Sequence, residues 1–384
     1  MTYSFTLTRA PALACVQTMS PEQIKPLTSL RFFAALWVVL YAYINELDLG
    51  VHFGLIDHGY LGVDLFFVLS GFILSHVYLE DFGAGRFTYG TFISHRLARI
   101  YPLHIATLLF TVLLLGVAAW NGVQLDANAG DPAALPAHLL LLQAWGLAPA
   151  ASFNHPSWAI SAEWFAYLSF PVVAFAAWRL RARPMLATGL AVLLLVVLYI
   201  VFDAVAGFPL THATFQWGAL RIVPAFLLGA ALYLARRAGA VERPGIARTG
   251  AMAASLILIA AGSYSRADVV IVIACGLLVL SMSGLGRDGA GILSSPLLVY
   301  LGEISFATYM IYVPWKWVYL RLVNGLLGTG HAPMPFIWWV AGLLALVPLS
   351  MLAHHLIEVP CRGLVRRFGE KILVRFGPKF ARQG

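Results

Sequence analysis

The sequence predicts an all-α integral membrane protein, and three observations lead to this prediction. The chain has 384 residues, of which 60% are hydrophobic and only 11% are charged. Its mean hydropathy of +0.82 is far above that of an ordinary soluble domain. The apolar residues gather in runs long enough to cross about 30 Å of hydrocarbon as helices. Aromatic residues, at 13% of the chain, suit helices that are anchored at both membrane interfaces.

About ten apolar runs have the length of a transmembrane helix. We expect them at residues 29–47, 60–79, 101–119, 158–178, 185–203, 217–236, 249–265, 268–284, 297–319 and 336–357. A shorter apolar segment, 138–145, precedes the fourth run and is expected to be interfacial or re-entrant. Because the number of crossings is even, both ends of the chain should lie on the same side of the membrane.

Lysine and arginine are distributed unevenly between the predicted loops. Roughly twenty fall on one side of the spans and only Arg266 and Arg321 on the other, so both termini are expected to be cytoplasmic. We divide the chain into a cytoplasmic lead-in, 1–26, a transmembrane domain, 27–362, and a basic cytoplasmic tail, 363–384. The formal charge of +8 does not indicate nucleic acid as a partner, because the basic residues sit in short loops between apolar spans.

Polar side chains inside the spans are the candidate functional residues, since an ionisable group at mid-span costs roughly 2.5–3.5 kcal/mol. Counting from the predicted helix ends gives an outer layer, whose members could face one cavity. In a purely structural alternative, Asp64 or Glu163 pairs with Arg221 or Lys316, and Lys316 reaches the interface. The outer layer comprises Ala42, Asp64, Glu163, Arg221, Tyr312 and Lys316.

An inner layer lies toward the expected cytoplasmic side and is rich in arginine and histidine. Arg96 and Arg99 share a helix face, and guanidinium groups bind phosphate oxygens in pairs. The alternative is simple anchoring at the basic interface. The layer comprises Arg31, His76, Arg96, Arg99, His104, Glu303, His354, His355, Glu358 and Arg362.

Six motifs, spread over nearly the whole chain, resemble those of acyltransferase family 3, polytopic enzymes that move acyl groups onto sugars. They lie at 30–43, 59–72, 96–102 (R-L-A-R-I-Y-P), 156–165 (P-S-W-A-I-S-A-E-W-F), 301–309 and 357–362. The resemblance implies a membrane O-acyltransferase, in the first place an O-acetyltransferase, of the bacterial cytoplasmic (inner) membrane. It would move an acyl group from cytoplasmic acyl-CoA to a sugar hydroxyl of an extracytoplasmic polysaccharide or glycolipid.

The resemblance also implies the partners of the protein. Acyl-CoA, in the first place acetyl-CoA, would be a donor substrate and not a permanently bound cofactor, and no metal is expected. The acceptor and membrane lipid are the other expected partners, and a homodimer remains open.

The site residues implied by the resemblance include two departures from the family pattern, the milder of which is Tyr312, three residues after Tyr309, where many relatives have a histidine. A histidine of the family follows the arginine by eleven residues, but this chain has Ala42 at that position. Arg31 and Ala42 share a helix face about 16 Å apart, so a donor held by arginines could carry its thioester to position 42. The expected catalytic positions are Ala42, Asp64, Glu163, Tyr312 and Arg221, and the expected acyl-CoA-binding residues are Arg31, His76, Arg96, Arg99 and Arg362.

Alanine cannot serve as a general base, whose loss typically costs about 10²–10⁴-fold in rate. The chain is therefore expected to be nearly inactive, either as an engineered or as a naturally degenerate variant. Two other functions remain open: a non-catalytic membrane subunit of a polysaccharide export or modification complex, and a glycolipid transporter. Transporters usually show internal repeats, and we find none in the sequence.

Overall fold

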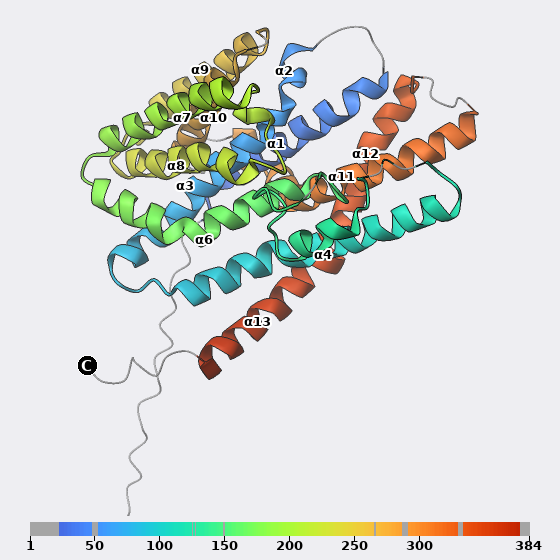
Figure 1. The fold of residues 1–384 in the computed structure, drawn as a ribbon. Helices are drawn as coiled ribbons and strands as arrows, with labels where there is room; N and C mark the ends of the chain where they lie inside the picture. The colour runs from blue at the N-terminus through green and yellow to red at the C-terminus, as the bar shows by residue number, and fades with distance from the viewer. Residues whose placement is uncertain are drawn as a thin grey trace, which may run out of the picture.

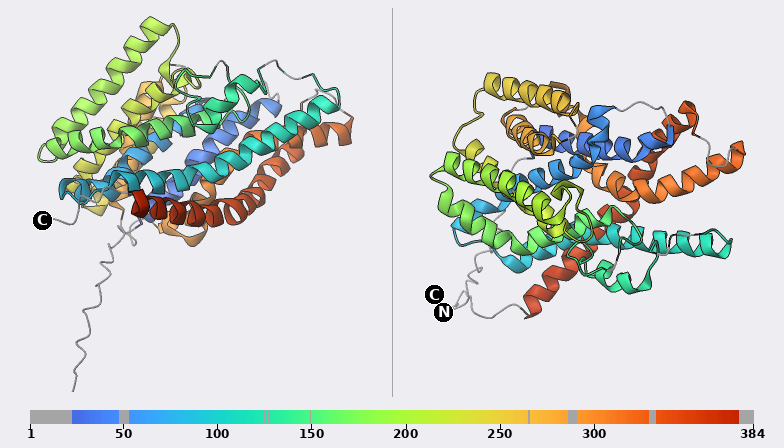
Figure 2. Two further views of the ribbon diagram at one scale, coloured as in Figure 1. Left: turned by 60° about the horizontal axis from the view of Figure 1, so that its bottom comes forward. Right: turned by 45° about the horizontal axis from the view of Figure 1, so that its top comes forward.

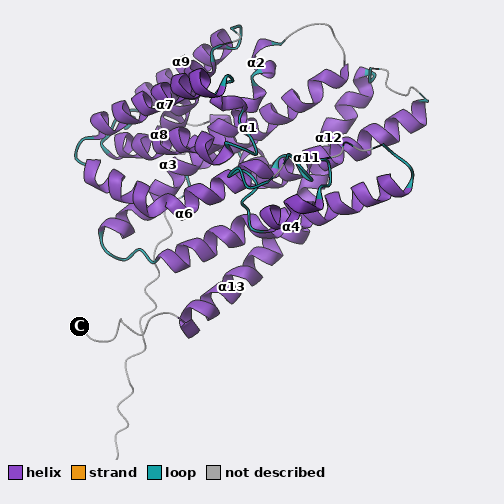
Figure 3. Ribbon diagram, viewed as in Figure 1, coloured by secondary structure: helices purple, strands orange, loops and turns teal. Residues whose placement is uncertain are grey.

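The computed structural model describes residues 23–47, 53–124, 126, 128–148, 150–264, 266–285, 291–328 and 333–376. Within these ranges the protein is helical and contains no strand (Figure 3). Most of the predicted lead-in, 1–22, and the last part of the predicted tail, 377–384, lie outside the described residues.

Nine helical segments of the described chain have the length and composition of membrane spans, and the protein is an all-α integral membrane protein. They contain α1 (Lys25–Ile44), α3 (Gly62–Gly83), α4 (Tyr89–Trp120), α6 (Ser157–Leu180), α7 (Pro184–Ala206), α8 (Gly218–Arg237), α9 (Pro244–Ala261), α11 (Pro296–Leu327) and α12 (Phe336–Ala353). The tenth expected run forms α10 (Asp268–Gly284), which at 17 residues is shorter than the others.

Short helices complete the fold. A single turn of π-helix, η6 (His354–Glu358), joins α12 to α13 (Val359–Phe376), and the three form one bent segment beside α4 (Figures 1 and 2). The remaining elements are η1 (Asn45–Leu47), α2 (Gly54–Asp57), η2 (Gly59–Leu61), η3 (Pro132–Ala134), α5 (Leu135–Leu139), η4 (Leu210–His212) and η5 (Gly291–Ser294).

Local sequence explains where the long helices begin and end. Proline stands in the first turn of α1, α7, α9 and α11, where its missing N–H is not needed. The Ser295 hydroxyl accepts a hydrogen bond from the Leu298 N–H at the start of α11. Gly207 and Gly328 end α7 and α11 in the left-handed conformation, with φ of 75° and 64°.

Glycine allows the central helices to approach closely. A Cβ at Gly71 of α3 would lie 2.0 Å from the Phe226 carbonyl oxygen of α8, and one at Gly302 of α11 would lie 1.9 Å from the Thr28 carbonyl oxygen of α1. We call the end of the bundle where α1 begins the near end, and the end where α1 finishes the far end. On this definition α4 and α11 also begin at the near end, and α3 and α6 begin toward the far end (Figure 1).

Two features add detail to the sequence prediction. Helix α4 begins at Tyr89, before the apolar run predicted at 101–119, so Arg96 and Arg99 lie within the same helix as that run. The apolar segment 138–145 folds back into the bundle, where the Ser161 hydroxyl donates to the Leu141 carbonyl at 2.7 Å and accepts from the Ala144 N–H at 3.0 Å. These contacts replace the hydrogen bonds that a turn lacks, so the segment can be buried without being a spanning helix.

Candidate functional site

A cavity of about 150 Å³ lies between α1, α3, α4, α6 and α11, and we call it the arginine cavity. Most of its lining is apolar and includes Phe66, Phe67 and Phe306. The polar residues that line it are Arg31, Ser70, Arg96, Arg99, Glu163, Tyr167 and Tyr309. Five helices far apart in sequence therefore bring three arginines and one carboxylate to a single apolar chamber.

Arg31 and Arg96 keep unused donors at this cavity. Arg31 forms no hydrogen bond or ion pair with any residue that the structure describes. Arg96 donates one hydrogen bond to the Tyr78 hydroxyl at 3.3 Å, while its buried Nε has no partner among the described residues. Leaving guanidinium donors unpaired inside a membrane protein is costly, which makes both side chains candidates for binding an anionic ligand.

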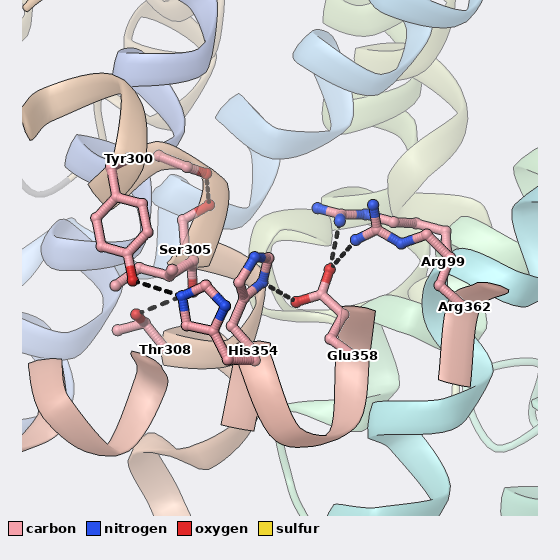
Figure 4. Close-up of polar contacts among 10 residues, drawn as sticks. Arg99, Tyr300, Ser305, Thr308, His354, Glu358 and Arg362 are labelled. Atoms are coloured by element: carbon pink, nitrogen blue, oxygen red, sulfur yellow. Dashed lines mark hydrogen bonds and ion pairs between the residues drawn. The ribbon is translucent and has the colours of Figure 1, made fainter. Parts of the chain in front are cut away.

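Arg99 is held in place by a carboxylate from the other end of the chain (Figure 4). Glu358 Oε1 accepts hydrogen bonds from both Arg99 and Arg362, and Oε2 lies 2.8 Å from His354 Nδ1. The π-turn η6 contains both His354 and Glu358, which are buried and four residues apart. Such turns occur frequently at functional sites, and this one places Glu358 against α4.

Glu163 reaches the cavity from α6. The Ser70 hydroxyl donates to Glu163 Oε1 at 2.9 Å, and Tyr167 lies beside the same carboxylate one helical turn further along. Two other residues of this motif are structural. Ser161 holds the segment before α6, and the ring of Trp158 lies 4.9 Å from the Arg221 guanidinium. Glu163 is the ionisable residue of the motif that lines the cavity, beside the apolar Ala159 and Ile160.

Asp64 and Arg221 form a buried ion pair. Arg221 Nη2 lies 2.6 Å and Nε 3.3 Å from the two oxygens of Asp64, and both side chains are almost fully buried. Arg221 also donates to the carbonyl oxygens of Tyr60 and Ala213 at 3.0 and 3.1 Å. The pair therefore joins α3 to α8, which is the structural alternative considered for these residues.

Position 42 lies in a different setting, at the far end of α1. Lys316 Nζ donates to the Ala42 carbonyl oxygen at 2.6 Å and pairs with Glu46 at the same distance. The Tyr43 hydroxyl donates to the Tyr312 carbonyl at 2.8 Å. Lys316 thus caps the C-terminus of α1, where a cation is favourable.

The expected outer layer is therefore divided among three places, and of its members only Glu163 lines the arginine cavity. Ala34 is level with Gly62, because a Cβ at Gly62 would lie 2.7 Å from the Ala34 carbonyl. Ala42 lies eight residues outward from Ala34, and Ser70, the partner of Glu163, lies eight residues inward from Gly62. Measured along the helices, Glu163 and position 42 are up to about 24 Å apart. The count from helix ends failed because α6 begins inside the bundle, after the buried segment 138–145.

The expected acyl-CoA-binding residues are also divided. Arg31, Arg96 and Arg99 line the arginine cavity, and Arg362 reaches its edge through Glu358. His76 instead lines a second cavity at the near end, of about 600 Å³, together with residues such as Lys25 and Arg236. Its ring lies 5.8 Å from that of Tyr233.

Three polar residues of the cavity, Ser70, Tyr167 and Tyr309, were not among the candidates from the sequence. Ser70 and Tyr167 carry no charge, and nothing in their spacing indicates that they contact Glu163. Glu358 was a candidate of the inner layer, and its contacts with His354 and Arg362 could have been predicted, because the three residues follow one another at intervals of four on one helix face.

Comparison with known proteins shows the family of this chain. The model of acyltransferase family 3, described as an acyltransferase domain, matches residues 25–355. The chain belongs to acyltransferase family 3.

It is 30% identical over 398 residues to "Acyltransferase MdmB" of Streptomyces mycarofaciens, covering 91% of this chain and 95% of that protein. It is also 51% identical over 49 residues to "Protein 2 in picA locus" of Rhizobium radiobacter, covering 13% of this chain and 26% of that protein. No solved structure matches the chain. The protein is thus a multi-pass membrane acyltransferase.

Proposed function

We propose that the protein transfers an acyl group, in the first place acetyl, from acyl-CoA to a sugar hydroxyl of a polysaccharide or glycolipid. The observation that carries this proposal is the arginine cavity, where Arg31 and Arg96 keep N–H donors without a partner in the described chain. Phosphate oxygens of the donor, or the oxyanion that forms at its thioester, would complete these hydrogen bonds.

The charge of the site favours an anionic donor. Arg31, Arg96, Arg99 and Arg362 contribute four positive charges, and Glu163 and Glu358 contribute two negative charges, so these six side chains carry a formal net charge of +2. Because these charges lie in a medium of low dielectric, an anionic group would be attracted strongly.

The shape of the cavity favours an extended ligand. Val63 and Leu74 of α3 both line it, and eleven residues of helix span about 16 Å. Phenylalanine, leucine and isoleucine form most of the wall, which suits the pantetheine arm and the acyl group of the donor. In our proposal the near end is cytoplasmic, the donor enters there, and the protein lies in a bacterial inner membrane with the acceptor on the far side.

Donor binding by the purified protein in lipid nanodiscs tests this proposal. We expect acetyl-CoA and CoA to bind the native chain, and Arg31→Gln to weaken binding by about 10- to 100-fold, the range for losing a hydrogen bond to a charged group. High salt should also weaken binding. Arg248→Gln, which removes an exposed arginine of α9, is the matched control. Equal affinities for the native chain and both variants would contradict the proposed donor site.

A further inference from the structure

We propose that Glu163 is the general base of this protein, so that the chain is active although it has alanine at position 42. This inference rests on the proposed function, because it requires the thioester of acyl-CoA to lie in the arginine cavity. It differs from the expectation drawn from the sequence, in which the missing imidazole leaves the protein nearly inert.

The described carboxylates near the core differ in how far their oxygens are occupied. Asp64 is fully buried and bound to Arg221, and Glu358 is bound by two arginines and His354. Glu163 is partly exposed, lines the cavity and accepts hydrogen bonds only from the neutral hydroxyl groups of Ser70 and Tyr167 among the described residues. A carboxylate offers about four acceptor sites, so Glu163 can accept a proton from a hydroxyl that enters the cavity.

Glu163 and Arg31 are arranged as a base and an oxyanion donor. The two side chains are close enough to interact electrostatically, yet they form no ion pair with each other. A reacting carbonyl between them would find an N–H donor on one side and a base on the other, which is the arrangement that acyl transfer requires. Ser70 fixes the orientation of the carboxylate and is a positioning residue.

The chemistry balances with these groups. Glu163 takes the proton of the acceptor hydroxyl as the hydroxyl oxygen attacks the thioester carbonyl, and Arg31 stabilises the tetrahedral oxyanion. The C–S bond then breaks, the acyl group stays on the acceptor oxygen as an ester, and the leaving thiolate of CoA takes the proton from Glu163. The carboxylate is regenerated, and no further reactant is needed.

Position 42 is unsuited to this role in the described structure. It is not among the residues that line the arginine cavity, and Lys316 beside it is bound to Glu46 and to the Ala42 backbone carbonyl. The cavity therefore contains a base of its own, and replacing an imidazole at position 42 by alanine does not remove it.

Glu163→Gln tests the inference, because it keeps the size of the side chain and removes its basicity. Membranes from cells in which the gene has been deleted supply the acceptor, and radiolabelled acetyl-CoA and propionyl-CoA are the donors. We expect the native chain to move label into products other than CoA and the variant to lose about 10²–10⁴-fold in turnover. The affinity for CoA should be nearly unchanged, a separation that a purely structural role would not produce.

Further variants separate the possible failures. Glu163→Asp should recover part of the turnover, and Asp203→Asn, which removes an exposed carboxylate of α7, is the control and should keep the turnover of the native chain. A native chain that does not bind acyl-CoA would contradict the proposed function itself. If the native chain binds acyl-CoA but transfers no label, or if Glu163→Gln keeps its full turnover, the assignment of Glu163 as the base is wrong and the donor site stands.

Discussion

At the near half of α1, Arg31 faces a cavity without a hydrogen bond to the described chain, whereas at the far end Lys316 is bound to Glu46 and to the Ala42 carbonyl. Both cations lie in or beside an apolar span, but only the first is left unsatisfied. Folding gains nothing from an unpaired buried charge. We infer from this contrast that the Arg31 end of α1 binds a ligand and that the Ala42 end of α1 holds helices together.

The largest change in stability should come from a substitution outside α1, in the buried ion pair of Asp64 and Arg221. Asp64→Asn leaves Arg221 without its counter-ion inside the bundle, and we expect a loss of about 3–5 kcal/mol in the free energy of unfolding. Thermal unfolding of the purified protein measures this loss. If the variant instead remains as stable as the native chain and loses turnover, Asp64 belongs to the catalytic machinery and the contrast between the two ends must be redrawn.

Arg31→Gln should affect stability in the opposite direction to its effect on binding. Because no described residue pairs with Arg31, removing its charge should stabilise the protein, by at most about 3 kcal/mol, the insertion cost of a mid-span arginine. The melting temperature without ligand should therefore rise while the affinity for acyl-CoA falls. A lower melting temperature would show that Arg31 supports the fold.

Lys316→Gln should give the smallest effect and the reverse pattern. The side chains of Lys316 and Glu46 are 21% and 29% exposed, so their pairing is partly screened by solvent. We expect a loss of about 0.3–1 kcal/mol, typical of a cation at a helix C-terminus, and unchanged affinity for acyl-CoA. Weaker donor binding in this variant would place Lys316 in the site and weaken the contrast with Arg31.

The sequence predicted much of this fold because hydropathy and helix length are local properties. Each of the ten apolar runs forms a helix, and the family motifs identified Arg31, Arg96, Arg99 and Glu163, which the structure brings together. The depth of each candidate side chain within the helix bundle was harder to predict. It depends on where each helix begins, and the start of α6 inside the bundle is set by the contacts of Ser161 with Leu141 and Ala144.

The pairing of charged side chains between helices could also not be predicted from the sequence. Several pairings of Asp64, Glu163, Arg221 and Lys316 were equally compatible with their charges, and only the crossing of α3 and α8 selects Asp64 for Arg221. Glu358 reaches Arg99 through a π-turn, a change in helical register that spacing alone does not predict.

The comparison of the native chain with Ala42→His in acyl transfer tests the central claim most directly. If the arginine cavity contains its own base, the native chain transfers acyl groups, and histidine at position 42 raises the rate by much less than the roughly 10²-fold that a general base supplies. An inert native chain that gains two orders of magnitude or more in the Ala42→His variant, with both proteins folded and binding acyl-CoA equally, would contradict the account and return the chemistry to the far end of α1.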